Sequence, residues 1–432
     1  MSSVARLRIA LPSLLLLSAA GACGDDDRPA GGVDAGPGMD DGGGTDAGPE
    51  EDAGPGDECD TRPADAPDTR GELEGVLDAE RGRILAYGGN TAAPEMCMPR
   101  YNLVSDMWAF HLDCNSWERL PDATGPGVRA RHAATLDTTA SRMIIFGGRD
   151  RMPTGGYVNF NDVWAYDLAT DAWSEIAATG DAPSPRSSAA IAYDGAANRI
   201  VVFGGNTSAD GLVLTGTNDM YALDLGTGVW TEITAASPPA PRLYHTSAMF
   251  GHEWLVFGGT PDFDGPYYND VHAFDLWTET WRQVAGGGPD APLTRFGAGA
   301  FVDAERGRLV VVAGHDAAAM GNRNDMWALD LGAGTWTELH PGDTYNGGSA
   351  GFCMFPPDFT TPEDGAPERR YSFLVAQDET RGFVFGGKTD CGNANDVWAV
   401  DFATDAWVPL RAATGGIACN RSGATTCSTL CF

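Results

Sequence analysis

The sequence predicts an all-β domain built from six copies of one repeat. Two observations carry this prediction: an Asp recurs at intervals that are mostly near 55 residues, and a Trp follows each copy of it by 11 residues. Such spacing is typical of repeat architectures, in which each repeat is one unit that packs on its neighbours. The pairs are Asp106 and Trp117, Asp162 and Trp173, Asp219 and Trp230, Asp270 and Trp281, Asp325 and Trp336, and Asp396 and Trp407.

Each repeat is expected to form four antiparallel strands, which we call a to d. In the third repeat these are residues 186–193, 199–203, 219–225 and 230–233, which alternate in polarity and are separated by Gly, Asn and Asp. A single four-stranded sheet cannot bury both of its faces. Six such sheets packed face to face around an axis can, so the repeats predict a six-bladed β-propeller.

Three features of the repeats resemble the kelch family. A Gly-Gly pair ends strand b, an aromatic residue occupies strand c, and the recurring Trp opens strand d. The resemblance covers residues 70–410 and implies a kelch-type propeller whose recurring residues form the scaffold. Two copies depart from the pattern, with Ala313-Gly314 for the glycine pair and His272 for the strand-c aromatic. The other strand-c aromatics are Trp108, Trp164, Tyr221, Trp327 and Trp398.

Residues 1–23 are expected to be a targeting signal. Arg6 and Arg8 precede an apolar run, 9–19, that is too short to span a bilayer, and small residues then lead to Cys23. This ending resembles the lipobox of bacterial lipoproteins, which implies that Cys23 carries acyl chains. The protein is then expected on the bacterial cell envelope, at the outer membrane, held there only through lipid. The alternative is an ordinary cleaved secretory signal.

Residues 24–69 are expected to be a disordered linker. They hold 15 acidic residues against two arginines, and Asp-Ala-Gly-Pro occurs three times. Like charges and few apolar residues favour an extended, solvated spacer. The propeller is expected over 70–411, and a cysteine-containing tail over 412–432. The net charge of −32 opposes binding to nucleic acid, so we expect no nucleic-acid partner.

The predicted ring closes without a blade shared between the chain ends, although many kelch rings share one. Residues 70–78 give the first repeat its own strand a, and residues 407–410 give the last its own strand d. We expect a disulfide between a cysteine before residue 115 and one after residue 352 to act as a clasp. The pairing stays open among Cys59, Cys97, Cys114, Cys353, Cys391, Cys419, Cys427 and Cys431.

Ligand binding is expected on the face that carries the long connections. The b–c and d–a connections are longer than the other turns, and both emerge on one face of a meander. Loops on a rigid scaffold often carry binding sites, and Arg with aromatic residues is typical of binding patches. The alternative is that some candidates only stabilise their own loops. The candidates are Arg149, Arg151, Tyr267, Tyr268, His315 and Lys388, with Arg100, Tyr101, Tyr157, Arg323 and Tyr345.

One arginine opens strand a in every repeat. The kelch resemblance places strand a innermost, so six guanidinium groups are expected around the channel mouth. Kelch domains that bind acidic peptide loops contact ligand carboxylates from such positions. The alternative, favoured by regular recurrence, is a structural ion pair with an Asp of the same blade. The arginines are Arg70, Arg129, Arg186, Arg242, Arg295 and Arg370, and five have an Asp eight residues later: Asp78, Asp137, Asp194, Asp303 and Asp378.

Catalysis has little support in the sequence. The seven histidines are scattered, no Gly-x-Ser-x-Gly motif occurs, and the cysteine spacing fits no zinc site. We expect no catalytic residue, metal or cofactor, and a monomer that binds a protein or glycan through the b–c/d–a face. The kelch resemblance leaves one alternative, an enzyme of the sialic-acid-isomerase type acting on a sugar-like anion at the channel mouth.

Overall fold

The computed structural model describes residues 65–92, 101–122, 124–316, 321–346, 360–363, 365–390 and 392–414. Contacts divide the chain into two units, Met1–Ala53 and Gly54–Phe432, and every described residue belongs to the second. The predicted signal sequence and most of the predicted linker and tail lie outside the described residues. Within these ranges the chain forms strands and connections. A membrane-crossing helix is absent from the described part of the chain.

Six of the sheets share one topology, in which consecutive antiparallel strands run outward from the first. We call each of these sheets a blade. Blade 1 contains β1 (Glu74–Asp78), β2 (Arg83–Tyr87), β3 (Met107–His111) and β4 (Ser116–Leu120). Blade 2 contains β5 (Ala133–Asp137), β6 (Arg142–Phe146), β9 (Val163–Asp167) and β10 (Ala172–Glu175). Blade 3 contains β12 (Ala190–Asp194), β13 (Arg199–Phe203), β14 (Met220–Asp224) and β15 (Val229–Glu232).

The remaining blades follow the same order. Blade 4 contains β16 (Thr246–Phe250), β17 (Glu253–Phe257), β18 (Val271–Asp275) and β19 (Thr280–Ala285). Blade 5 contains β21 (Gly299–Asp303), β22 (Arg308–Asp316), β23 (Asn322–Asp330) and β24 (Thr335–His340). Blade 6 contains β28 (Leu374–Gln377), β29 (Arg381–Phe385), β32 (Val397–Asp401) and β33 (Ala406–Arg411).

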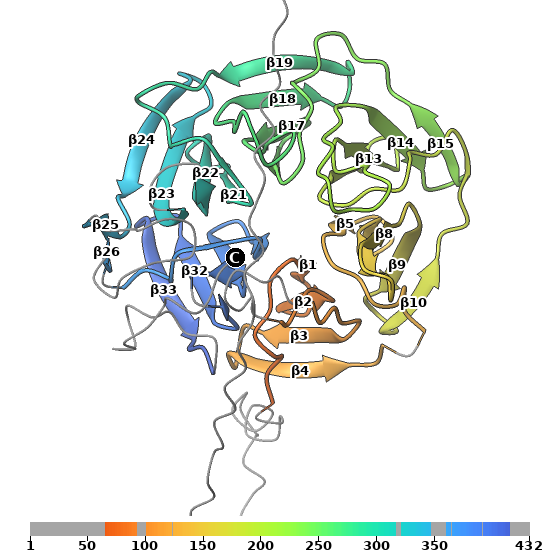
Figure 1. The fold of residues 1–432 in the computed structure, drawn as a ribbon, viewed down its shortest axis with the longest axis horizontal. Helices are drawn as coiled ribbons and strands as arrows, with labels where there is room; N and C mark the ends of the chain where they lie inside the picture. Colours follow the sequence, from red (N-terminus) through yellow and green to blue (C-terminus); the bar gives the residue numbers. More distant parts are fainter. Residues whose placement is uncertain are drawn as a thin grey trace, which may run out of the picture. The chain divides into compact units, whose positions relative to one another are not determined.

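The innermost strands close a circle. Along the sequence β1, β5, β12, β16, β21 and β28 each contact the next, and β28 contacts β1 (Figure 1). The described domain is therefore an all-β propeller. Its first and last blades are each built from one stretch of chain, so the prediction that no blade is shared is confirmed.

Strand a begins later than the sequence predicts. In the third repeat it starts at Ala190, not at residue 186. The difference arises because Ser187 instead pairs with Asn206, and Ser188 has a φ of 54° that interrupts the strand. Ser187 and Ser188 lie on the face of the propeller that carries the b–c and d–a connections, which we call the loop face.

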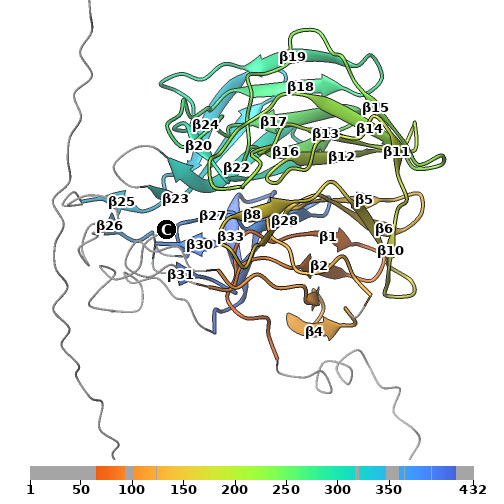
Figure 2. The ribbon, with the colours of Figure 1, turned by 45° about the vertical axis from the view of Figure 1, so that its right-hand side comes forward.

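Several short strands outside the blades lie on this face. They include the hairpin of β7 (Arg149–Arg151) and β8 (Tyr157–Asn159), and the sheet of β27 (Arg370–Tyr371), β30 (Lys388–Thr389) and β31 (Gly392–Asn393). Figure 2 shows β27, β30 and β31 lying together beside the blades. The others are β20 (Arg295–Phe296), β25 (Thr344–Tyr345) and β26 (Thr360–Thr361). A further short strand, β11 (Thr179–Gly180), instead pairs with the beginning of β15 and adds a fifth strand to the outer edge of blade 3.

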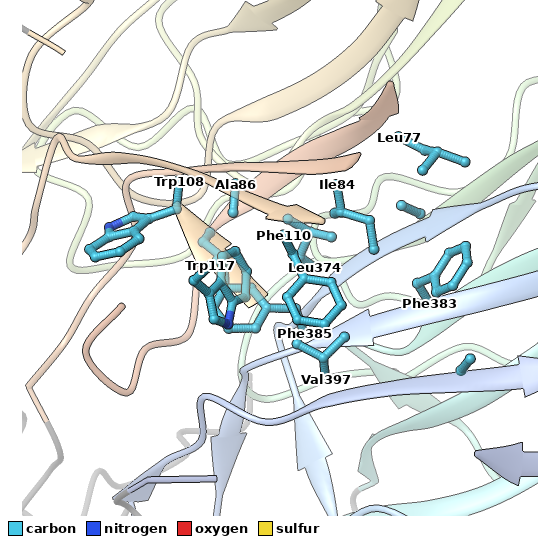
Figure 3. Packing of buried hydrophobic residues seen from close by; sticks show 13 residues of the cluster. Leu77, Ile84, Ala86, Trp108, Phe110, Trp117, Leu374, Phe383, Phe385 and Val397 are labelled. Atoms are coloured by element: carbon cyan, nitrogen blue, oxygen red, sulfur yellow. The ribbon is translucent and has the colours of Figure 1, made fainter. Parts of the chain in front are cut away.

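Each junction between neighbouring blades has its own apolar core. Between blades 6 and 1, Trp117 packs on Phe385 with ring centroids 4.5 Å apart (Figure 3). Each of the other five junctions also contains one of the recurring tryptophans, as expected of a scaffold residue that fills the space between sheets.

Hydrogen bonds also cross the junction between blades 6 and 1. The Gly387 N–H donates to the Arg70 carbonyl at 2.7 Å, and the Asn393 and Asn395 amides donate to the carbonyls of Asn90 and Pro67. All cysteines except Cys114 lie outside the described residues, so the disulfide clasp stays a prediction.

Candidate functional site

The six strand-a arginines are buried in closed networks within their own blades. Arg186 donates from both Nη atoms to Asp219, at 2.6 and 2.9 Å, and its Nη1 also donates to the Gly204 carbonyl. Its side chain is 0% exposed. This geometry favours the structural ion pair over a ligand contact. The other pairs are Arg70–Asp106, Arg129–Asp162, Arg242–Asp270, Arg295–Asp325 and Arg370–Asp396.

One network accounts for most of the repeat motif. The strand-c indole of Trp164 donates to Asp162 at 2.9 Å, and His272 makes the equivalent contact with Asp270. A Cβ on the first glycine of the pair would lie 2.6 Å from the next blade's arginine carbonyl at Gly147. The Asp eight residues after the arginine has a different partner, the arginine that opens strand b, as in Asp137 with Arg142.

Two residues after each arginine, the backbone forms a circle that we call the backbone ring. Each N–H donates to the carbonyl of its counterpart in the preceding blade, and the Glu72 N–H closes the circle by donating to the Ser372 carbonyl at 2.9 Å. Every member has a positive φ, between 50° and 62°. A side chain in this left-handed conformation costs about 1–2 kcal/mol, so the circle holds strained residues at the channel mouth. Its members are Glu72, Arg131, Ser188, Tyr244, Gly297 and Ser372.

Two ring members belong to a buried charged cluster. The Glu72 carboxylate accepts from Arg131 Nη2 at 2.5 Å and from Lys388 Nζ at 2.6 Å, and Arg149 Nη2 lies 3.6 Å from it. We call these four residues the mouth cluster. Its three cations share one described carboxylate, whereas every strand-a arginine has its own.

The electrostatics follow from this imbalance. Burial alone raises the pKa of Glu72, but the charges of Arg131, Lys388 and Arg149 hold it well below its usual range. Burial lowers the pKa of Lys388, and burial together with the charge of Arg131 lowers the pKa of Arg149. The cluster therefore has more buried positive charge than Glu72 neutralises.

Aromatic rings surround the cations. The guanidinium of Arg149 lies 3.7 Å from the ring centroid of Tyr157, and that of Arg151 lies 4.3 Å from the centroid of Tyr101. Arg131 lies over Tyr244 at 4.7 Å. Arg151 is half-buried, it forms no ion pair with a carboxylate among the described residues, and its Nη1 has no hydrogen-bond partner there.

The structure brings some of the predicted candidates together and places others elsewhere. Arg149, Arg151 and Lys388 lie at or beside the mouth cluster. Tyr268 lies under the guanidinium of the buried Arg242, 4.6 Å from the ring centroid. Tyr267 and His315 both pack on Phe296, at the edge of an apolar group that includes Tyr244 and Tyr371.

Three further candidates were named for their loops. Arg323 pairs with Asp316, so it is held within blade 5. Tyr345 lies partly exposed on β25. Arg100 lies outside the described residues.

Sequence reasoning missed Glu72 and Arg131. Both occupy the second position after the strand-a arginine, where the other repeats have Ser188, Tyr244, Gly297 and Ser372. A repeat position whose residue changes from blade to blade was the available signal. No group of metal-ligating side chains is assembled within the described ranges.

Comparison with known proteins identifies the repeats. Residues 60–197 and 154–360 match the KLHDC2/KLHL20/DRC7 kelch-repeats domain. Acyl-CoA-binding domain-containing protein 5 of Arabidopsis thaliana is 30% identical over 232 residues, 54% of this chain and 33% of that protein. Kelch domain-containing protein 3 of Rattus norvegicus is 26% identical over 275 residues, 60% of this chain and 68% of that protein.

A third relative is Kelch domain-containing protein 10 of Xenopus tropicalis, 26% identical over 297 residues, 66% of each chain. This chain covers only a third of the plant relative's length. The family match extends over well over half of the chain and coincides with blades that carry the Gly-Gly, Trp and Arg–Asp pattern. The chain therefore belongs to the kelch-repeat family of β-propeller proteins.

Proposed function

We propose that this protein is a six-bladed kelch propeller that binds an acidic segment of a partner protein through its loop face. One observation carries the proposal: among the described residues, Arg131, Arg149 and Lys388 share a single carboxylate, Glu72. A buried charge without a partner is costly, so a site with excess positive charge favours an incoming anion. The carboxylates of the partner would supply the missing negative charge.

The surroundings of the cluster support a protein partner. Seven of the ten large exposed hydrophobic residues of the described chain lie on connections of the loop face. Apolar residues around a central Arg and Tyr group are the composition of a protein interface. The seven residues are Val128, Val158, Leu212, Val213, Phe263, Leu293 and Tyr345.

Binding to a peptide tests the proposal directly. The probe is a fluorescein-labelled peptide of alternating Glu and Leu, titrated with the intact protein and followed by fluorescence anisotropy. We expect saturable binding that weakens with salt, and none to the matched Gln–Leu peptide. Equal binding of both peptides, or binding only to a sulfated glycan such as heparin, would rule out the acidic-peptide proposal.

We also propose that a lipid at Cys23 holds the propeller at the bacterial envelope, with residues 24–69 as spacer. This part rests on the leader sequence alone, because the relatives named above come from plants and animals. Cys23→Ser should release the protein from membranes or block its maturation. Wild-type fractionation and size would contradict the anchor. The enzymatic alternative has no supporting observation among the described residues.

A further inference from the structure

The b–c connection of blade 3, between β13 and β14, presents two large apolar side chains to solvent on the loop face. Leu212 is 54% exposed and Val213 is 68% exposed. Among the ten large exposed hydrophobic residues of the described chain, they are the one pair adjacent in sequence, and we call them the apolar pair. Contiguous apolar surface in water favours contact with another molecule.

The residues around the apolar pair hold it in this exposed position. Asp210 Oδ1 accepts from the backbone N–H of Leu212 at 3.0 Å and from that of Val213 at 3.4 Å. The Gly211 carbonyl accepts from Arg149 Nη1 of the mouth cluster at 3.3 Å.

The residue after the apolar pair is anchored as well. Leu214 is 5% exposed and belongs to the apolar group that includes Tyr244 and Phe296. The connection is thus fixed on both sides of the apolar pair. Turning the pair inward would break these contacts, so its exposed surface is a constant feature of the loop face.

The apolar pair lies next to a cation that has no carboxylate of its own. The hairpin of β7 and β8 turns at Gly155 and Gly156. A Cβ at Gly155 would lie 4.0 Å from Arg151 Nη2. A Cβ at Gly156 would lie 3.8 Å from Leu212 Cδ1, so Arg151 and Leu212 flank the same turn. The Nη1 of Arg151 has no hydrogen-bond partner among the described residues.

We propose that the acidic segment is recognised at two points: one of its carboxylates pairs with Arg151, and a bulky aliphatic side chain near that carboxylate covers the apolar pair. This inference rests on the proposed function and adds the second kind of residue that the partner segment must contain. Charge complementarity directs the carboxylate to Arg151. Contact between the aliphatic side chain and the apolar pair removes apolar surface of both partners from water. A segment that contains acids alone would satisfy only the first point.

The test compares the alternating Glu–Leu peptide with a peptide of alternating Glu and Ser of the same length, each titrated with the intact protein and followed by fluorescence anisotropy. The two peptides carry the same charge and differ only in the apolar side chain. We expect the Glu–Ser peptide to bind roughly tenfold more weakly. The double variant Leu212→Ser/Val213→Ser should weaken the Glu–Leu peptide by a similar factor. It should leave binding of the Glu–Ser peptide unchanged, because Arg151 is still present.

Val408→Ser is the matched control, because Val408 is 42% exposed on β33, the outer strand of blade 6. It should bind both peptides as the wild type does. Thermal melting checks that each variant folds. If the double variant melts early, Val213→Ser takes its place, with an expected loss of roughly threefold for the Glu–Leu peptide.

The possible outcomes separate this inference from the proposed function. Equal affinities for the Glu–Leu and Glu–Ser peptides, or unchanged Glu–Leu affinity in the folded variant, would overturn the two-point inference and leave the acidic-peptide proposal standing. Equal binding of the Glu–Leu and Gln–Leu peptides, weakened in the variant, would indicate a purely apolar site and overturn both. Absence of binding to the Glu–Leu peptide would also overturn both.

Discussion

Buried cations occur in two settings in this propeller. One set is the recurring strand-a arginines, and the other is Arg131, Arg149 and Lys388 of the mouth cluster. Each recurring arginine has its own aspartate, and a glycine or alanine carbonyl accepts from it as well. Arg131, Arg149 and Lys388 share Glu72. Both sets lie near the loop face, and both are at least largely buried. What separates them is whether the charge is balanced within the blade.

Within each repeat, the side chains that recur in every blade and the side chains that differ between blades occupy separate positions. The pair of arginine and aspartate returns in every blade, where it joins the start of strand a to the start of strand c. In five blades a strand-c Trp or His272 also contacts the aspartate. Two residues after the arginine the backbone also returns, as the ring, but its side chains differ in each blade. The repeat thus fixes the backbone at the channel mouth and leaves the chemistry of the mouth free to vary.

Breaking a recurring pair should give the largest effect. Arg186→Gln removes one partner of a buried bidentate pair and leaves Asp219 and the Gly204 carbonyl without their donor. We expect the free energy of unfolding to fall by about 3–5 kcal/mol, measured by urea denaturation. Peptide binding by the molecules that remain folded should not change.

The matched control for that variant is Arg119→Gln. Arg119 pairs with Asp122 at 3.4 Å, but its side chain is 63% exposed. An exposed pair contributes little, so the loss should stay within about 0.5 kcal/mol. Equal losses in the two variants would mean that the recurring pairs are not scaffold elements. A binding defect in Arg186→Gln without a stability defect would indicate that these arginines contact the ligand.

The next effect depends on pH and concerns Glu74, an acid with no cation. Its folded pKa of about 8 lies above the value of an exposed carboxyl, so folding takes up a proton. Its contribution is therefore fully present below the unfolded pKa and is lost as pH rises toward 8. Relative to Glu74→Gln, the wild-type protein should lose on the order of 3 kcal/mol of stability between pH 5 and pH 8. Parallel stability curves for the two proteins over this range would contradict the burial of Glu74.

A smaller effect should appear in binding rather than in stability. Arg151 lies on Tyr101 and forms no described ion pair. A charged hydrogen bond from it to a ligand carboxylate is worth about 1.5–3 kcal/mol, so Arg151→Gln should weaken the Glu–Leu peptide at least about tenfold. The thermal midpoint should stay near that of the wild type. Anisotropy and thermal melting on the same sample separate the two outcomes, and wild-type affinity would exclude Arg151 from the site.

The sequence predicted the repeat architecture well because its signals are local and recur. The spacing of Trp117 and its counterparts marked the junctions between blades, and the continuity of the first and last repeats was visible in the order of their strands. Arg149, Arg151 and Lys388 could be nominated because they interrupt the repeat with charged residues on long connections.

The mouth cluster itself could not be assembled from the sequence. Glu72 and Lys388 are 316 residues apart, and they meet only because the propeller closes. The partner of the strand-a arginines was also ambiguous, since five of the six have an Asp eight residues later in the chain and all six have another Asp before strand c. In the structure the guanidinium pairs with the Asp before strand c, whereas the Asp eight residues later stands at the far end of strand a and pairs with the arginine that opens strand b, as Arg186 with Asp219 and Asp194 with Arg199 show.

The backbone ring should give the smallest effect, and it tests whether the ring imposes its conformation on any residue. Gly297 and Ser188 occupy equivalent positions, with φ of 62° and 54°. Gly297→Ala forces a side chain into the left-handed region and places a Cβ 3.1 Å from Tyr371, so it should destabilise the protein by about 1–2 kcal/mol. Ser188→Gly removes the same strain, but it frees the unfolded chain, so we expect a gain of at most about 1 kcal/mol. Urea denaturation of both variants gives the signs. Opposite signs identify the ring as a backbone constraint that acts on every blade, whereas a loss of stability in both would mean that Ser188 is held there by its side chain.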